Sequence, residues 1–164
     1  MLKWFNNKKK DNKGFSLVEL IIVVAIMAIL VGLLAPQYIE YVEKSRKSAD
    51  ATNMDTLVNA VQVRAADAET DIPVGEYTIT LKKDAEPVIK KGNTLLYATQ
   101  EGQKGYQFVD AIAENVADYK SVRLKSNKWK ADPTAHIKVT EDGSTTITYS
   151  GEDFAKFVGK TQAK

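Results

Sequence analysis

The pattern of hydrophobic positions changes sharply near the start of the chain. Twenty-one residues, Phe15–Ala35, are almost wholly apolar, and one acid, Glu19, interrupts them. A helix of that length rises about 1.5 Å per residue and reaches about 31 Å, the hydrocarbon thickness of a bilayer. The run therefore predicts a membrane-spanning helix. A carboxylate inside such a segment costs several kcal/mol unless something pairs with it, so the sequence also predicts a partner for Glu19.

Beyond Tyr38 the pattern becomes amphipathic. Apolar residues recur at three- and four-residue intervals and predict one buried stripe, formed by Met54, Leu57, Val61, Ala65 and Ala68. Charged residues are expected on the opposite, solvent-facing side: Glu40, Glu43, Lys44, Arg46, Lys47, Asp50 and Asp55. The helix is expected to run from about residue 15 to about residue 68. Its own domain can cover only half of that length, so the other half needs lipid or other subunits.

Shorter elements are expected after this helix, whose period is broken by Pro73 and Gly75. Alternating apolar and polar residues predict strands at Tyr77–Leu81 and Thr94–Thr99. One apolar face predicts a helix over residues 107–119, formed by Phe108, Ile112, Val116 and Tyr119.

The clearest β signal is AHIKVTEDGSTTITYS. Its alternation puts Ile137 and Val139 on one face, and we expect Ile147 and Tyr149 to pair with them across a turn at Glu141–Ser144. A short final helix is expected around Glu152–Val158. The predicted fold class is α+β, with one long N-terminal helix packed on a small antiparallel β-sheet.

Positive charge is concentrated before the apolar run. Residues 1–14 carry five lysines against Asp11, whereas the chain from Phe15 onward carries 18 basic and 20 acidic residues. Because lysine-rich flanks stay cytoplasmic, the C-terminal part is expected outside. A secretory signal fits poorly, since its apolar core is shorter and is followed by the cleavage site. The chain has no cysteine, which excludes disulfides, thiolate metal sites and thiol catalysis.

The residues KGFSLVE, followed by the apolar run and Pro36, resemble the leader and N-terminal helix of type IV prepilins. The resemblance is close over residues 8–40. It implies that a membrane peptidase cuts between Gly14 and Phe15 and methylates the new N-terminus at Phe15. It further implies a type IV pilin-like fold in three parts: a basic leader (1–14), an apolar transmembrane and assembly helix (15–37), and an extracellular globular domain (38–164) that includes the amphipathic half of the helix.

The resemblance gives Glu19 a role in assembly. In this family the acid is thought to pair with the N-terminal amine of a neighbouring subunit, which neutralises two charges in a dry helix bundle and sets the axial register. The alternative is an acid tolerated near the membrane interface. Pro36 removes a hydrogen bond to the carbonyl of Gly32, so these two residues predict a helix kink in the free subunit and local melting in a filament.

A second candidate site is basic. Five cations lie within eleven residues, with Trp129 among them: Lys120, Arg123, Lys125, Lys128 and Lys130. One interpretation is a surface that binds DNA or an anionic cell-wall polymer through phosphate charge. The alternative, favoured by the alternation of Val122 and Leu124 with the cations, is a strand with basic outward positions. Bulk charge makes nucleic acid an unlikely partner.

No catalytic, cofactor-binding or metal-binding residue is predicted. His136, the only histidine, shares a strand face with Lys138 and is expected at the surface. Three acids have a spacing that superficially suggests a calcium loop: Asp67, Glu69 and Asp71. The glycine and the distant glutamate of such a loop are absent, so a solvated helix end is expected. The P-loop, GxSxG and HExxH patterns do not occur, and the chain is not expected to be an enzyme.

The resemblance implies a structural subunit of a type IV pilus-like surface filament. The implied partners are further copies of the chain in a helical filament, minor pilins, a prepilin peptidase, an assembly platform with its ATPase, and membrane lipid before assembly. The subunit would begin as a single-pass membrane protein and end in an extracellular filament. The alternatives are a pseudopilin of a type II secretion or DNA-uptake machine, and a membrane-anchored binding module that does not polymerise. Without the C-terminal disulfide of many members, the terminal loop must be held by packing or by the final strand and helix.

Overall fold

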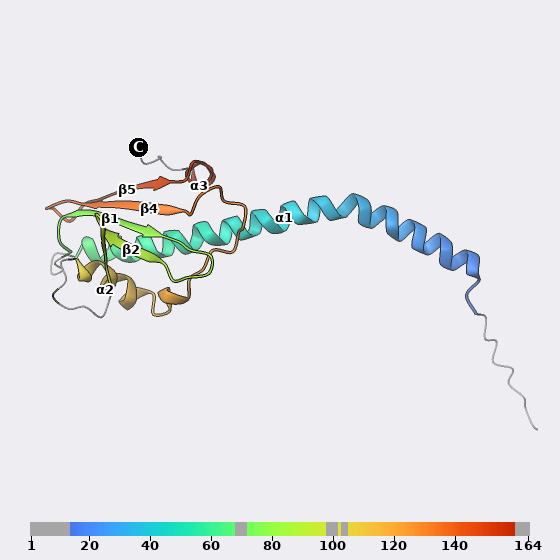
Figure 1. Ribbon diagram of the computed structural model, residues 1–164, viewed down its shortest axis with the longest axis horizontal. Helices are drawn as coiled ribbons and strands as arrows, with labels where there is room; N and C mark the ends of the chain where they lie inside the picture. Colours follow the sequence, from blue (N-terminus) through green and yellow to red (C-terminus); the bar gives the residue numbers. More distant parts are fainter. Residues whose placement is uncertain (1–13, 68–71, 98–101, 103–104, 160–164) are drawn as a thin grey trace, which may run out of the picture. The chain divides into compact units, whose positions relative to one another are not determined.

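The long N-terminal helix is present and dominates the secondary structure. A computed structural model of the chain describes residues 14–67, 72–97, 102 and 105–159 (Figure 1). Helix α1 (Leu17–Ala65) has 49 residues. By internal contacts the chain divides into two compact units, one ending at Tyr41 and the next beginning at Val42, here called unit 1 and unit 2. The helix begins two residues later and ends three residues earlier than expected, and Ala68 lies outside the described residues.

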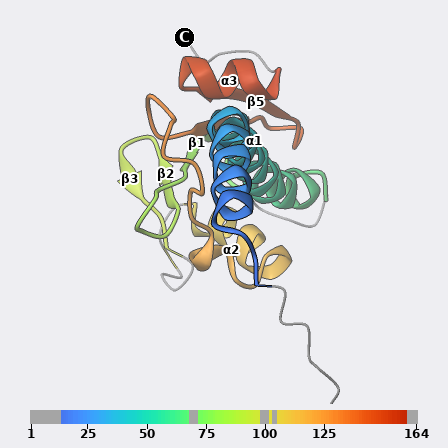
Figure 2. The ribbon, with the colours of Figure 1, turned by 90° about the vertical axis from the view of Figure 1, so that its right-hand side faces the viewer.

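Unit 2 contains a five-stranded antiparallel sheet with the spatial order β3–β2–β1–β4–β5. The strands are β1 (Gly75–Thr80), β2 (Val88–Lys91), β3 (Thr94–Leu95), β4 (Thr134–Val139) and β5 (Thr145–Ser150). The other helices are α2 (Tyr106–Asn115), the 3₁₀ helix η1 (Tyr119–Ser121) and α3 (Glu152–Val158). Figure 2 shows α3 beside β5 and α2 on the other side of unit 2. The fold is therefore α+β and pilin-like, as the sequence predicts.

The predicted β4–β5 hairpin and the final helix are confirmed. Ile137 lies opposite Ile147 in the register of the two strands, although Tyr149 pairs with Ala135 rather than with Val139. The tight turn between the strands is closed by the amide of Thr140, which donates to the carbonyl of Ser144 at 3.0 Å. Alternation therefore identified the inward face correctly.

Two other expectations need correction, and one strand was not predicted. Among the described residues, the strand expected at Thr94–Thr99 covers only Thr94–Leu95. The amide of Leu96 still donates to the carbonyl of Ile89 at 2.9 Å, and its side chain is buried in the core. Ala98 and Thr99 lie outside the described residues.

The helix expected over residues 107–119 ends at Asn115, since Val116 adopts φ −131° and Tyr119 belongs to η1. Strand β2 was not predicted, because its four residues do not alternate between apolar and polar side chains.

The core of unit 2 lies between the C-terminal half of α1, the sheet and α2. The predicted stripe is correct where it is described, since Met54, Leu57 and Val61 are completely buried. Tyr77 from β1 stacks on Phe108 from α2, with ring centroids 4.1 Å apart. Burial of these side chains supplies the main stabilising free energy, about 25 cal/mol for each Å² of apolar surface.

Candidate assembly site and the anchor of the basic segment

Glu19 lies in the first turn of α1 and caps the helix of its own chain. Its Oε2 accepts a hydrogen bond from the amide of Ser16 at 2.9 Å, and the hydroxyl of Ser16 accepts one from the amide of Val18 at 3.3 Å. These contacts resemble a capping box of a serine and a glutamate three residues later, except that the serine hydroxyl accepts from the amide two residues on. The negative charge also lies at the positive end of the helix dipole.

This geometry refines the expectation that Glu19 needs a partner from elsewhere. The Ser-x-x-Glu spacing in the sequence is itself a signal for such a cap at the start of a helix. The partner found is a neutral amide, which contributes no positive charge. Glu19 can therefore start the helix and still attract a cation.

The residues at the expected cleavage position are accessible. Gly14 and Phe15 precede α1 in irregular structure, and Phe15 is 88% exposed. A side chain added at Gly14 would meet nothing within 4 Å among the described residues. The conformation of the chain therefore does not require glycine at this position. A requirement for glycine here would instead come from a separate enzyme that recognises it.

Gly32 and Pro36 both lie inside α1, and the helix continues through them. A side chain at Gly32 would also meet open space, so packing within the described residues does not offset the cost of a helical glycine, about 1 kcal/mol relative to alanine. The kink of the free subunit and its melting in a filament stay predictions.

The apolar part of α1 is uncovered in the isolated chain. The helix is long and apolar enough to cross a membrane, and none of its most apolar window is buried. Leu33, for example, is 65% exposed. A contiguous apolar surface of this kind marks an interaction with lipid or with other protein chains.

The basic segment, defined as residues 120–130, does not form the strand that the alternation of Val122 and Leu124 suggested. Residues 122–133 have no regular secondary structure. The five cations also differ in their surroundings. Lys120 is exposed on η1, the guanidinium of Arg123 donates back to the carbonyls of Lys120 and Val122, and the side chains of Lys125, Lys128 and Lys130 are exposed.

A buried carboxylate holds this segment in place. Asp50 of α1 is 0% exposed, and its oxygens accept three hydrogen bonds. The donors are the amide of Lys125 at 2.6 Å, the amide of Ser126 at 3.0 Å and the indole nitrogen of Trp129 at 2.8 Å. A buried charge needs such compensation, and hydrogen bonds to a charged acceptor are about twice as strong as neutral ones.

Three acids of α1 that were expected on the solvent-facing side are at least half-buried. Asp50 was placed on the solvent side, but it belongs to the buried stripe. Asp55, also assigned to solvent, is half-buried and accepts a hydrogen bond from the hydroxyl of Tyr149 at 3.2 Å. Glu43 is half-buried as well, and it accepts a hydrogen bond from the hydroxyl of Ser126.

Trp129 extends the anchor to the C-terminal helix. Its ring packs edge-on against Phe154 and Phe157 of α3, at centroid distances of 5.1 and 5.7 Å. The ammonium of Lys47 lies 4.2 Å from the centre of the Trp129 ring. Since the chain has no cysteine, these contacts and the Asp50 hydrogen bonds hold the C-terminal region where a disulfide would otherwise serve.

The remaining polar candidates are His136 and the three acids near the end of α1. His136 is half-buried on β4, and one ring nitrogen lies 3.1 Å from the hydroxyl of Ser150. Within the described ranges, no group of three or more histidine, cysteine, aspartate or glutamate residues could hold a metal ion. Of the acids that superficially suggested a calcium loop, Glu69 and Asp71 lie outside those ranges.

The N-terminal part of the chain is similar to a known family of sequences. Residues 9–35 match the family model described as the prokaryotic N-terminal methylation motif. The chain carries the type IV prepilin-like leader signature. The matched residues of this prepilin-like chain include Gly14, Phe15 and Glu19, and they end at the last residue of the apolar run. They support a type IV pilin or pseudopilin, a structural class of protein. No curated protein and no solved structure matches the chain.

Proposed function

We propose that this prepilin-like chain is a structural subunit of a type IV pilus-like surface filament. The observation that carries the proposal is the coincidence of the methylation motif with a helix whose apolar side chains are uncovered. A prepilin peptidase cuts between Gly14 and Phe15 and methylates Phe15. The helix then holds the subunit in the membrane, with unit 2 outside, until an assembly platform and its ATPase add it to the filament.

Cleavage changes the chemistry around Glu19. In the uncleaved chain its carboxylate accepts a hydrogen bond from the Ser16 amide, next to the peptide bond that would be broken. Cutting that bond creates a cationic amine on Phe15. In a dry bundle of helices, an amine and a carboxylate are each costly alone, so pairing Glu19 with the Phe15 amine of a neighbouring copy neutralises both. A subunit displaced along the axis would leave both charges unpaired.

Two substitutions of Glu19 separate assembly from helix capping. Glu19→Ala removes both the cap and the charge, whereas Glu19→Gln keeps a side chain that can cap but carries no charge. We expect both variants to be inserted and processed, and both to yield less than about a tenth of the wild-type filament, because an uncompensated buried charge costs at least about 1.4 kcal/mol. Filament yield is measured in the fraction sheared from cells, and processing by the mass of the membrane-bound chain.

The glutamine variant decides the interpretation. Reduced assembly of Glu19→Gln together with normal processing supports charge pairing between subunits. Normal filament yield from Glu19→Gln would leave capping as the role of the residue and would overturn the pairing.

Pseudopilins of secretion and DNA-uptake machines share this N-terminal signature. The nearest alternative function is therefore that of a pseudopilin. Pilins accumulate in long surface filaments, which can be sheared from cells and seen by electron microscopy. Abundant chain in such filaments supports a pilin. A chain that is processed but stays in the envelope supports a pseudopilin, or an anchored binding module if no polymer forms.

A further inference from the structure

Three separate segments of unit 2 surround a groove of about 490 Å³. Its lining residues come from α1, from the connection between β1 and β2, and from the basic segment: Ser45, Arg46, Ala49, Lys83, Asp84, Leu124, Lys125 and Asn127. Backbone contacts hold these segments together. The amide of Leu124 donates to the carbonyl of Lys82 at 3.0 Å, and the Asp50 carboxylate holds the amide of Lys125.

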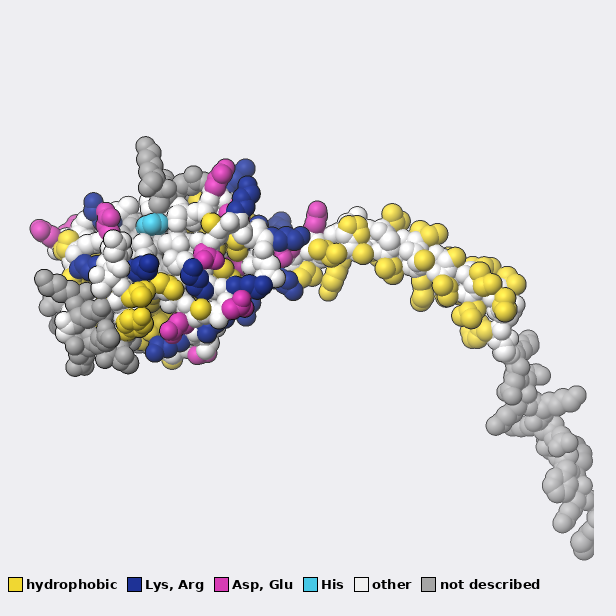
Figure 3. Space-filling view, viewed as in Figure 1, with side chains coloured by type: hydrophobic (Ala, Val, Ile, Leu, Met, Phe, Trp, Pro, Cys, Tyr) yellow, Lys and Arg dark blue, Asp and Glu magenta, His cyan; other side chains and the backbone are white. Residues whose placement is uncertain are grey.

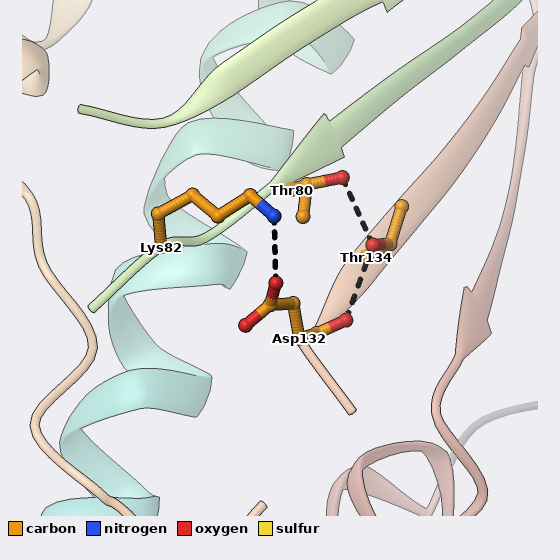
Figure 4. Close-up of polar contacts among 4 residues, drawn as sticks. All are labelled: Thr80, Lys82, Asp132 and Thr134. Atoms are coloured by element: carbon orange, nitrogen blue, oxygen red, sulfur yellow. Dashed lines mark hydrogen bonds and ion pairs between the residues drawn. The ribbon is translucent and has the colours of Figure 1, made fainter. Parts of the chain in front are cut away.

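The groove carries an excess of positive charge. Arg46, Lys83 and Lys125 are exposed, and Asp84 is the one acid among its lining residues. No ion pair in the described part of the chain includes any of the three cations. The adjacent Lys82 differs, because its ammonium lies 2.7 Å from a carboxylate oxygen of Asp132 and is neutralised there (Figure 4). Three cations with one acid favour an anionic occupant.

The position of the groove along the chain limits the choice of anion. Arg46 follows the end of the apolar run at Ala35 by eleven residues, which corresponds to about 17 Å of helix. The polar interface of a bilayer is about 5–8 Å deep, and charges interact over about a further 8–10 Å in physiological salt. Between them, Tyr38 and Tyr41 are exposed on α1, as aromatic residues at a membrane interface are.

The cations of unit 2 are thus tethered within electrostatic reach of the membrane that would hold unit 1. Figure 3 shows Lys and Arg side chains gathered on unit 2 over the N-terminal end of its part of α1. We propose that the cations of the groove attract unit 2 to the headgroup layer of anionic lipids while the subunit is still in the membrane. Arg46, Lys83 and Lys125 supply the three positive charges of this attraction, and each cation near an anionic surface contributes about 1 kcal/mol. The proposal rests on the membrane-held stage of the proposed function, but not on polymerisation.

The proposal is tested on the full-length chain in lipid vesicles. A Trp4→Phe background leaves Trp129, which lies in the basic segment, as the only tryptophan. Vesicles contain pyrene-labelled phosphatidylglycerol or pyrene-labelled phosphatidylcholine, and quenching of Trp129 reports how often each lipid is a neighbour. We expect phosphatidylglycerol to be preferred about fivefold or more at low salt, the contribution of a single cation near an anionic surface. The preference should fall in about 0.5 M salt, where screening is strong.

Matched charge removals locate the binding. Lys83→Gln/Lys125→Gln removes two cations from the groove, and Lys138→Gln/Lys156→Gln removes two exposed cations from β4 and α3. The groove variant should lose most of the lipid preference with an unchanged circular dichroism spectrum, and the control variant should keep it. Equal quenching by the two lipids, or equal loss in both variants, overturns the proposal.

Two soluble competitors test other sources of phosphate. Glycerol 3-phosphate, or a short DNA duplex, is added to the vesicles at the concentration of the exposed anionic lipid. We expect the preference for phosphatidylglycerol to persist, because the tether keeps the headgroup layer close at all times. If either competitor abolishes it, the groove is a site for free phosphate or for nucleic acid instead. Filament yield plays no part in these measurements, so their failure would leave the proposed function standing.

Discussion

Units 1 and 2 share one helix but differ in how its apolar side chains are covered. In unit 2 the fold covers those of the buried stripe, and Leu57 is 0% exposed beneath the sheet. In unit 1 nothing in the described chain covers them, and Leu33 is 65% exposed. Unit 2 therefore carries its own source of stability, whereas unit 1 depends on lipid or on other subunits.

The two acids of this helix show the same difference. Asp50 has three donors from its own chain and no exposure to solvent. Glu19 has one neutral amide and is exposed, so its charge is still uncompensated. A buried carboxylate whose donors all come from its own chain stabilises the fold. A carboxylate with one donor, on a surface that must become buried, points to a partner in another chain.

The largest expected effect comes from the same truncation made in the two units. Leu57→Ala should lower the free energy of unfolding of unit 2 by about 3–5 kcal/mol, because it removes a fully buried side chain and leaves a cavity. Leu33→Ala should change it by less than about 0.5 kcal/mol. Both are measured by denaturant unfolding of the full chain in non-ionic micelles, followed by Trp129 fluorescence in a Trp4→Phe background. Equal losses would show that the two units do not differ in this way.

The next effect tests whether Asp50 anchors the basic segment. Asp50→Ala leaves three donors without their acceptor, and we expect the free energy of unfolding to fall by about 3 kcal/mol. Asp50→Asn should lose most of that amount, because its amide group would face one of the donors. The same denaturant unfolding measures both variants.

Hydrogen exchange gives this prediction a local control. The amides of Lys125 and Ser126 should exchange faster in Asp50→Asn, while amides in the β4–β5 hairpin should change less. An Asp50→Asn variant as stable as the wild type, with unchanged exchange at those two amides, would contradict the anchor.

The smallest expected effect concerns an exposed acid of unit 2. Hydrogen bonds from Thr140 and Ser144 lower the pKa of Asp142 from 3.8 to about 2. Because the folded-state pKa lies below the unfolded value, this stabilisation is complete above about pH 4 and is lost as the pH falls towards about 2. Asp142→Asn should remove this part of the pH dependence of unfolding, measured as the difference from the wild type. Identical pH profiles would show that the turn gains nothing from the ionised carboxylate.

Much of the fold could be predicted from periodicity. The apolar run follows from its unbroken length, and the stripe from Met54 to Ala65 and the β4–β5 hairpin follow from side chains that alternate between core and solvent. The cleavage position between Gly14 and Phe15 is read from the leader motif and stays a prediction.

The burial of Asp50 and the form of β3 and of the basic segment depend on contacts that the residue types do not indicate. Asp50 precedes Met54 by four residues and Leu57 by seven, so the period itself put it on the buried stripe, although its charge suggested solvent. Its donors come from a segment about 75 residues later, and local sequence carries no signal for that pairing. The two-residue strand β3 and the irregular basic segment likewise owe their form to neighbours distant in sequence rather than to their own propensity.

The most direct test of the central claim is the N-terminal mass of this chain in sheared surface filaments. Filaments are purified from cells that produce the wild-type chain, and the chain is analysed by intact-mass and tandem mass spectrometry. The account predicts a chain that begins at Phe15 and carries one N-methyl group. A filament chain that retains Gly14 and the leader, or filaments that contain none of this protein, would contradict it.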